Sequence, residues 1–183
     1  MKTNDKPGEF RGRGEVRLVR LLPGPIERVW EFLINPEKRE RWFAGGPMDG
    51  RKGGKIRFRF RHANLAPDEV PPEEYQKFHD PGAELVCTVT RWDPPQVLAF
   101  TFGSDEESVV TIELSTVGRR VRLVLTHRAT GTDVPALTNF AAGWHLHFTH
   151  LIALLERRPR PPFWPMHAKL EAAYERRRDR NRR

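Results

Sequence analysis

The sequence predicts an α+β domain in which a curved antiparallel sheet of about six strands surrounds a long C-terminal helix, with two short helices after the first strand. Three observations predict this class. Segments of alternating apolar and polar residues are joined by short turns, which is typical of antiparallel strands. Two short helical segments follow the first strand. An apolar stripe with helical spacing runs through residues 134–157.

The first strand is expected near Glu15–Leu22, and the tripeptide at residues 23–25 (Pro-Gly-Pro) ends it. Pro25 suits the first position of a helix, because the N–H group that proline lacks is not needed there. A second short helix begins at Pro36 and reaches Trp42. The first helix has one apolar face with side chains at i, i+3, i+4 and i+7, formed by Ile26, Val29, Trp30 and Leu33.

The clearest strand signal is the strict alternation in Lys55–His62, where three arginines alternate with Ile56, Phe58, Phe60 and His62. The Pro-rich insertion loop of residues 63–83 follows, with at most one helical turn in Glu73–Phe78. We expect this loop to be disordered or a plain insertion, and a lid over a binding site is the alternative. Four further strands are expected near Glu84–Trp92, Val97–Phe102, Val109–Ser115 and Arg120–Arg128.

A long helix is expected from about Val134 to Arg157, before the prolines that begin at Pro159. It is the only expected element large enough to cover the inner face of the sheet. A curved sheet around such a helix leaves a space, which large aromatic rings either fill or line. The apolar stripe of this helix consists of Leu137, Phe140, Ala141, Trp144, Phe148, Leu151 and Leu155.

We expect the chain to divide into a disordered N-terminus (residues 1–13), a domain (residues 14–157) and a basic helical tail (residues 158–183). Most of the net charge of +8 lies at the C-terminal end, because residues 157–183 hold ten Lys/Arg and three Asp/Glu. The body is nearly neutral, so the overall basicity does not indicate specific nucleic-acid binding. We expect the tail to be solvated, or to dock on the domain or on a partner subunit through Phe163, Trp164, Leu170 and Tyr174. The alternative is a contact of its arginines with an acidic protein partner, RNA or anionic lipid.

Several classes of protein are excluded by residues that the chain lacks. Cys87 is the only cysteine, so no intramolecular disulfide or multi-cysteine metal site is expected. No metal or other cofactor is predicted. No apolar run approaches the roughly 20 residues of a membrane span, and the first residues lack the apolar core of a secretory signal. We therefore expect a cytoplasmic protein without a transmembrane segment.

Five short motifs, in this order and spacing, resemble a known family. They are residues 25–30 (PIERVW), 41–43 (RWF), 89–102 (VTRWDPPQVLAFTF), 125–127 (LTH) and 143–144 (GW). The chain resembles the START-like (helix-grip, SRPBCC) superfamily and, within it, the family related to the C-terminal domain of the activator of Hsp90 ATPase. The resemblance implies the helix-grip fold, with an apolar cavity between the sheet and the long helix. That superfamily includes lipid and hormone binders, aromatic-polyketide cyclases and co-chaperone domains. The Pro-rich loop and the basic tail depart from the family pattern.

The leading hypothesis is binding of a small apolar molecule in this cavity. One alternative is a protein-interaction or co-chaperone-like module that uses its surface and basic tail. The second is a cavity enzyme, of cyclase or hydrolase type, that uses His127. No inward pair of carboxylates suggests acid–base catalysis, so no catalytic residue is assigned. His145, His147 and His150 are expected to be partly exposed or structural. The expected cavity lining is Trp30, Trp42, Phe58, Phe60, Phe100, Phe102, His127, Phe140, Trp144 and Phe148.

Overall fold

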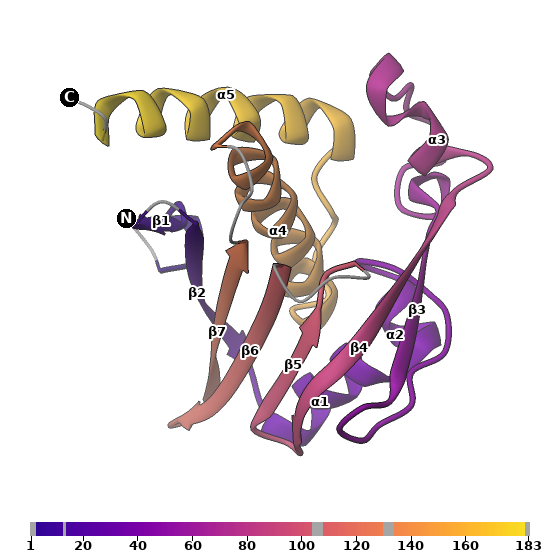
Figure 1. The fold of residues 1–183 in the computed structure, drawn as a ribbon, viewed down its shortest axis with the longest axis vertical. Coiled ribbons are helices and arrows are strands. Elements are labelled where there is room, and N and C mark those ends of the chain that lie inside the picture. Colours follow the sequence, from indigo (N-terminus) through magenta and orange to yellow (C-terminus); the bar gives the residue numbers. More distant parts are fainter. Residues whose placement is uncertain (1–2, 13, 104–107, 130–133, 182–183) are drawn as a thin grey trace.

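The sheet is fully antiparallel and strongly curved in the computed structural model, which describes residues 3–12, 14–103, 108–129 and 134–181. Its seven strands follow the order β1-β2-β7-β6-β5-β4-β3 (Figure 1). Neighbouring strands thus follow one another along the chain, except that β2 pairs with β7. The strands are β1 (Glu9–Arg11), β2 (Glu15–Pro23), β3 (Lys55–Phe60), β4 (Ala83–Asp93), β5 (Val97–Thr101), β6 (Ser108–Val117) and β7 (Arg120–Ala129).

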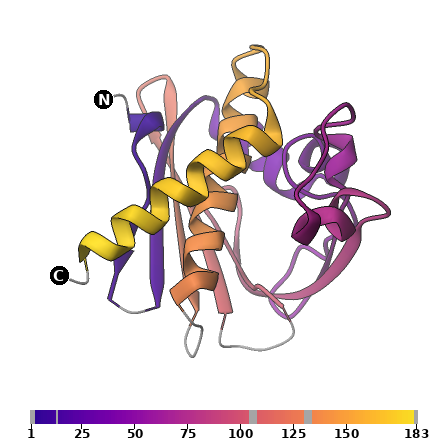
Figure 2. The ribbon, with the colours of Figure 1, turned by 90° about the horizontal axis from the view of Figure 1, so that it is seen from above.

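Two long helices lie on the concave side of the sheet, one stacked on the other. The helix α4 (Val134–Leu155) lies against this face, and α5 (Phe163–Asn181) crosses over α4 on the side away from the sheet (Figures 1 and 2). The short helices α1 (Ile26–Ile34) and α2 (Pro36–Glu40) close one end of the sheet. The remaining helical pieces are the 3₁₀ turns η1 (Thr3–Asp5), η2 (His62–Asn64) and η3 (Glu73–Tyr75), and α3 (Gln76–His79).

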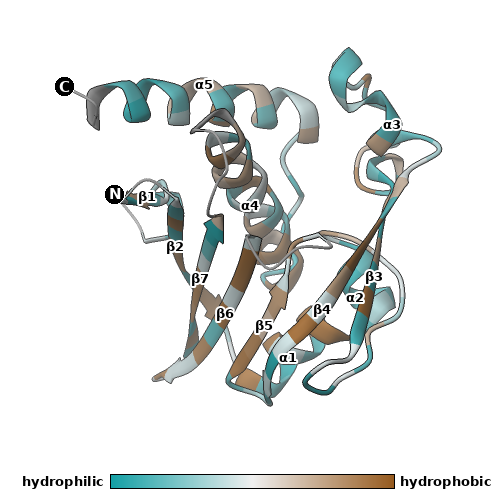
Figure 3. Ribbon diagram, in the orientation of Figure 1, coloured by the Kyte–Doolittle hydropathy of each residue, from teal (hydrophilic) through white to brown (hydrophobic). Residues whose placement is uncertain are grey.

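Alternation along the strands explains which face of the sheet is covered. Every second residue of β2 is buried, and β3 shows the same period, with Ile56 and Phe58 buried and the intervening arginines exposed. Figure 3 shows apolar and polar residues alternating along the strands. On the outer face, Glu84 pairs with Arg57 (2.8 Å) and Arg59 (3.3 Å), so the arginine stripe is a solvated, ion-paired surface.

The predicted fold class is confirmed, and the strand count is seven instead of about six. The additional strand is β1, which lies within residues 1–13, a segment expected to be disordered. The tail holds it in place: the backbone N–H of Gly8 donates to the hydroxyl of Tyr174 (2.6 Å), and Phe10 packs edge-on against the same ring (5.9 Å). A partner 166 residues away cannot be recognised from local composition. Residues 1, 2 and 13 lie outside the described residues.

Residues 62–82, called the roof segment below, contain η2, η3 and α3 and pack against α5. The carboxylate of Glu69 accepts hydrogen bonds from the backbone N–H groups of Phe163 and Trp164, at 2.8 Å each. The ring of Tyr75 stacks on Trp164 at 5.5 Å, and the Trp164 indole N–H donates to Nδ1 of His79 (3.3 Å). The insertion loop is therefore ordered by contacts with the tail, and the tail docks on the domain.

Among the helices of the described residues, none combines the length and the apolar character that crossing a membrane requires.

Candidate functional site

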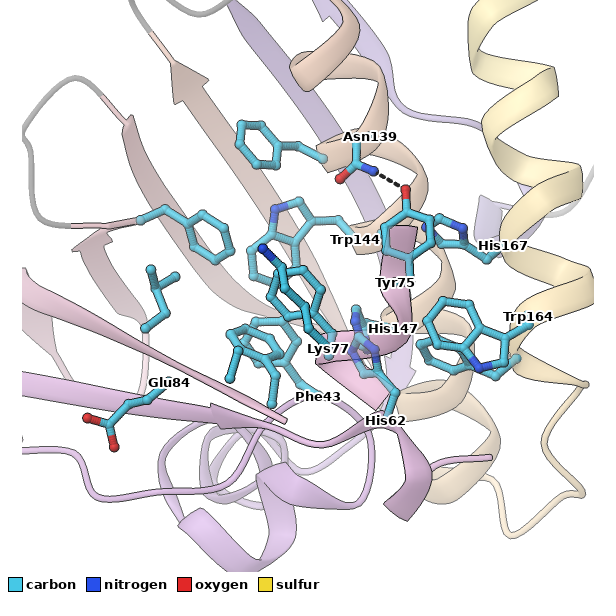
Figure 4. A pocket seen from close by; sticks show the side chains of 18 residues that line it. Phe43, His62, Tyr75, Lys77, Glu84, Asn139, Trp144, His147, Trp164 and His167 are labelled. Atoms are coloured by element: carbon cyan, nitrogen blue, oxygen red, sulfur yellow. Dashed lines mark hydrogen bonds between the residues drawn. The ribbon is translucent and has the colours of Figure 1, made fainter. Parts of the chain in front are cut away.

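A pocket of about 490 Å³ lies between α4, the end of β3, the start of β4, the roof segment and the first turns of α5 (Figure 4). Its volume falls within the range of about 300–1,000 Å³ that is usual for small-molecule sites. The exposed side chain of Lys77 is among the lining residues, whereas the carboxylate of Glu84 points away from the pocket and pairs with arginines on the outer face of the sheet. The remaining lining is mostly aromatic, so the pocket has an apolar interior.

One wall of the pocket is built from rings of the sheet, α4 and the loop after α2. Phe43 stacks on Trp144 at 5.0 Å and meets Phe60 edge-on at 5.1 Å. Phe102 contacts Phe140 at 5.7 Å. Because aromatic side chains contribute large apolar surface, this wall suits a flat apolar molecule. An apolar ligand gains about 25 cal/mol for each Å² that it removes from water there.

Gly143 leaves space in the pocket on the side formed by α4, because it has no side chain. A Cβ atom built at this position would have no heavy atom within 4 Å outside its own helix neighbourhood, although the residue lies in the middle of α4 and lines the pocket. Glycine in a helix interior costs about 1 kcal/mol relative to alanine. The chain therefore gives up helix stability at a point where any side chain would occupy the pocket.

The opposite wall is a hydrogen-bonded network that joins the roof segment to both long helices. The hydroxyl of Tyr75 donates to Oε1 of Glu171 (2.6 Å) and accepts from the amide of Asn139, as Figure 4 shows for the Asn139–Tyr75 bond. Nδ1 of His167 lies 3.3 Å from Oε2 of Glu171. Burial, followed by the bond to Glu171, raises the pKa of Tyr75 well above its ordinary value. The Tyr75 hydroxyl therefore stays protonated and serves as a fixed link.

Three histidines line the pocket, and burial lowers the pKa of each: His62 to about 4, His147 well below 6.5, and His167 below its ordinary value. All three are neutral at pH 7. Nδ1 of His147 donates to the backbone carbonyl of Trp42 (2.8 Å), whereas neither ring nitrogen of His62 has a hydrogen-bond partner. Of the two alternatives expected for His145, His147 and His150, partly exposed or structural, the second holds, because all three are buried where α5 covers this side of α4.

The pocket is displaced from the position that the sequence suggests. Of the ten expected lining residues, Phe60, Phe102, Phe140 and Trp144 line it. The others lie in the packed core, where Trp42 stacks on Phe148 (5.8 Å). A void of about 10 Å³ lies beside Trp42 and its neighbours, and it is too small for a ligand. The six residues outside the pocket are Trp30, Trp42, Phe58, Phe100, His127 and Phe148.

His127 points inward as predicted, but its ring is satisfied by the protein. Nδ1 accepts a hydrogen bond from the Trp144 indole N–H (3.1 Å), so in the neutral ring Nε2 carries the proton and can donate to Oγ of Ser108 (2.8 Å). The ring also stacks on Phe140 at 4.3 Å. Burial lowers the pKa of His127 to about 3. These contacts give His127 a structural role beside the pocket.

Most of the lining was not expected from the sequence. Tyr75, Phe78 and His62 come from the roof segment, and Phe163, Trp164 and His167 come from α5. The one local signal that could have located the pocket is Gly143, a glycine inside a long apolar helix. Cys87 is buried in the core, as its strand position suggests, and this burial raises the pKa of its thiol to about 11. Among the described residues, no cluster of His, Cys, Asp and Glu could hold a metal ion.

The fold and the pocket define a helix-grip protein of the START-like class. Residues 23–156 match the family of activator of Hsp90 ATPase homolog 1-like proteins, and this chain belongs to that family. A Bordetella parapertussis protein of known solution structure is 40% identical, with 94% of this chain and 91% of that chain covered and a TM-score of 0.78.

More distant structures share the fold alone. CalU16 from Micromonospora echinospora is 19% identical, with 88% of this chain and 85% of that chain covered and a TM-score of 0.63. The Aha1 dimer from Colwellia psychrerythraea is 14% identical, with 78% of this chain and 96% of that chain covered and a TM-score of 0.58. No curated protein matches this sequence.

Proposed function

We propose that this protein binds a small, largely apolar molecule in the pocket between α4, the sheet and the roof segment. The observation that carries the proposal is Gly143, the point of α4 where a side chain would enter the pocket and where none is present. A core that needed only stability would place alanine or a larger side chain there, because close packing and helix propensity both favour it.

The surroundings of the pocket support binding more than catalysis. Its buried titratable groups are neutral imidazoles and a phenol, and its carboxylate Glu84 is exposed and paired with arginines. No nucleophile with an adjacent base is present among the described lining residues. The function therefore rests on apolar burial and on the few polar groups that orient the ligand.

The test uses pyrene, a fluorescent four-ring hydrocarbon, titrated into the wild-type chain and two variants of one residue. Gly143→Trp places an indole in the pocket and is expected to weaken binding at least about tenfold, which corresponds to 1.4 kcal/mol. Gly143→Ala adds only a methyl group to the pocket and is expected to weaken binding clearly less than Gly143→Trp does. Equal affinity of the wild type and Gly143→Trp would show that pyrene binds elsewhere and would contradict the proposal.

A protein partner or a second copy at the basic end of α5 stays a prediction. Of the apolar residues of α5 that we expected to dock on the domain or on a partner subunit, Phe163, Trp164 and Tyr174 are buried against the domain. Any partner must therefore use the exposed face of α5.

A further inference from the structure

His62 and His147 lie side by side in the pocket and place polar ring nitrogens within its mostly aromatic lining. Their ring centroids are 5.7 Å apart, and both side chains come from elements that meet only in the folded chain, η2 and α4 (Figure 4). Phe163 packs against both rings, at 4.9 Å from His62 and 5.6 Å from His147. The two imidazoles are thus held in place within an aromatic frame.

The hydrogen bonds of His147 determine what it offers to a ligand. A backbone carbonyl only accepts, so the contact from Nδ1 to the carbonyl of Trp42 places the proton on Nδ1. Nε2 then carries a lone pair and makes no hydrogen bond with another described residue. Because burial keeps this ring neutral, Nε2 is a hydrogen-bond acceptor in a pocket whose other deep lining is largely aromatic.

The unpartnered ring nitrogens of His62 are a second observation that supports a polar group on the ligand. This side chain is only 9% exposed, and both of its ring nitrogens lack a partner. A buried polar group without a hydrogen bond costs roughly 1–3 kcal/mol, and such groups are uncommon in folded proteins. Both nitrogens are covered by neighbouring side chains, so His62 would reach a ligand only after its ring turns about the Cβ–Cγ bond.

We infer that the ligand of this pocket is a neutral, mainly apolar molecule that carries a hydroxyl or N–H group, which donates to Nε2 of His147. A hydroxyl fits best, because it can also accept the N–H of a turned His62 ring. A carboxylate or phosphate at the same position would face the lone pair of Nε2 and would lose its hydration without a cation to replace it. Lys77, the lysine among the lining residues, is exposed, and the carboxylate of Glu84 is paired with arginines on the outer face of the sheet. This inference rests on the proposed function.

The experiment compares 1-hydroxypyrene, which can donate a hydrogen bond, with 1-methoxypyrene, which cannot, and uses pyrene as the reference. The wild-type chain is expected to bind 1-hydroxypyrene about five- to tenfold more tightly than 1-methoxypyrene, as one net hydrogen bond allows. This comparison needs no variant. Equal affinity for the two compounds would overturn the inference and leave the proposed function standing if pyrene binds. Failure of the wild type to bind pyrene would overturn both.

Two variants of His147 assign the preference to one atom. In His147→Asn, the amide nitrogen can still donate to Trp42, but nothing replaces Nε2, so the preference for the hydroxyl is expected to disappear. In His147→Gln, a polar group returns to the position of Nε2, and the preference is expected to recover in part. A preference that persists in folded His147→Asn would show that another group binds the hydroxyl and would contradict the assignment.

Discussion

The carboxylate of Glu69 accepts a hydrogen bond from the backbone N–H of Trp164 at 2.8 Å and thereby fastens the roof segment to the start of α5. Its other oxygen accepts from the N–H of Phe163. The first N–H groups of a helix have no partner within the helix, and a negative charge there also complements the helix dipole. One side chain therefore joins the two segments that form the far wall of the pocket.

Replacing Glu69 with alanine should loosen this junction. We expect the free energy of unfolding to fall by about 1 kcal/mol, the usual cost of losing a helix cap, and amide hydrogen exchange to accelerate in residues 62–82 and at the start of α5. The matched control is Asp68→Ala, which removes an exposed carboxylate from the neighbouring position. Similar exchange rates in the two variants would show that Glu69 does not hold the roof segment.

A second prediction concerns Arg39, a buried side chain of α2 at the end of the sheet that α1 and α2 cover. It donates to five backbone carbonyls and lies over the ring of Phe58, with its Cζ atom 5.2 Å from the ring centroid. An ammonium group cannot reproduce this planar fork, so Arg39→Lys should lower the free energy of unfolding by about 2–4 kcal/mol. Urea titration measures it. Arg41→Lys, at an exposed side chain, should change stability by less than about 0.5 kcal/mol.

The stability of the fold should depend on pH through its buried histidines. Burial lowers the pKa of His127 and His145 to about 3 and of His62 and His150 to about 4, from 6.5. The unfolded chain therefore binds protons below about pH 6.5 that the folded chain does not. Stability is complete above that pH and falls toward pH 4, with each such histidine adding about 1.4 kcal/mol per pH unit to the slope.

The variant His145→Asn tests this assignment, since an amide can still serve Tyr174, whose hydroxyl lies 3.0 Å from Nδ1 of His145. Urea unfolding at pH 7, 6 and 5 should show a slope that is smaller by about one proton than in the wild type. A free energy of unfolding that stays constant between pH 7 and pH 5 would contradict the neutral state of these rings.

The sequence predicted the features that depend on local patterns. The alternation of Lys55–Phe60, the helical spacing around Trp144 and the proline at position 36 each determine one element, and the observed strands and helices follow them closely. The inward direction of His127 also followed from strand parity. Parity gives a direction but no partner, so it could not show that Trp144 and Ser108 already satisfy this ring.

The position of the pocket was not predictable in the same way, because one wall of it belongs to the roof segment and α5, which contact each other only in the folded chain. Tyr75 lies in a Pro-rich stretch that resembles a loop, and it reaches Glu171 across 96 residues. The rings near α1 and α2, such as Trp42 and Phe148, fill the space that we expected to be hollow. Periodicity alone does not distinguish rings that fill a cavity from rings that line one.

The indole N–H signals of the five tryptophans provide the sharpest test that the pocket receives an apolar ligand. Trp144 and Trp164 line the pocket, whereas Trp30 and Trp92 pack on each other outside it, at 5.3 Å. In a two-dimensional NMR titration with pyrene, we predict shifts of the Trp144 and Trp164 signals and unchanged signals of Trp30 and Trp92. Shifts confined to Trp30 and Trp92, or no shift at saturating pyrene, would contradict a binding site beneath the roof segment.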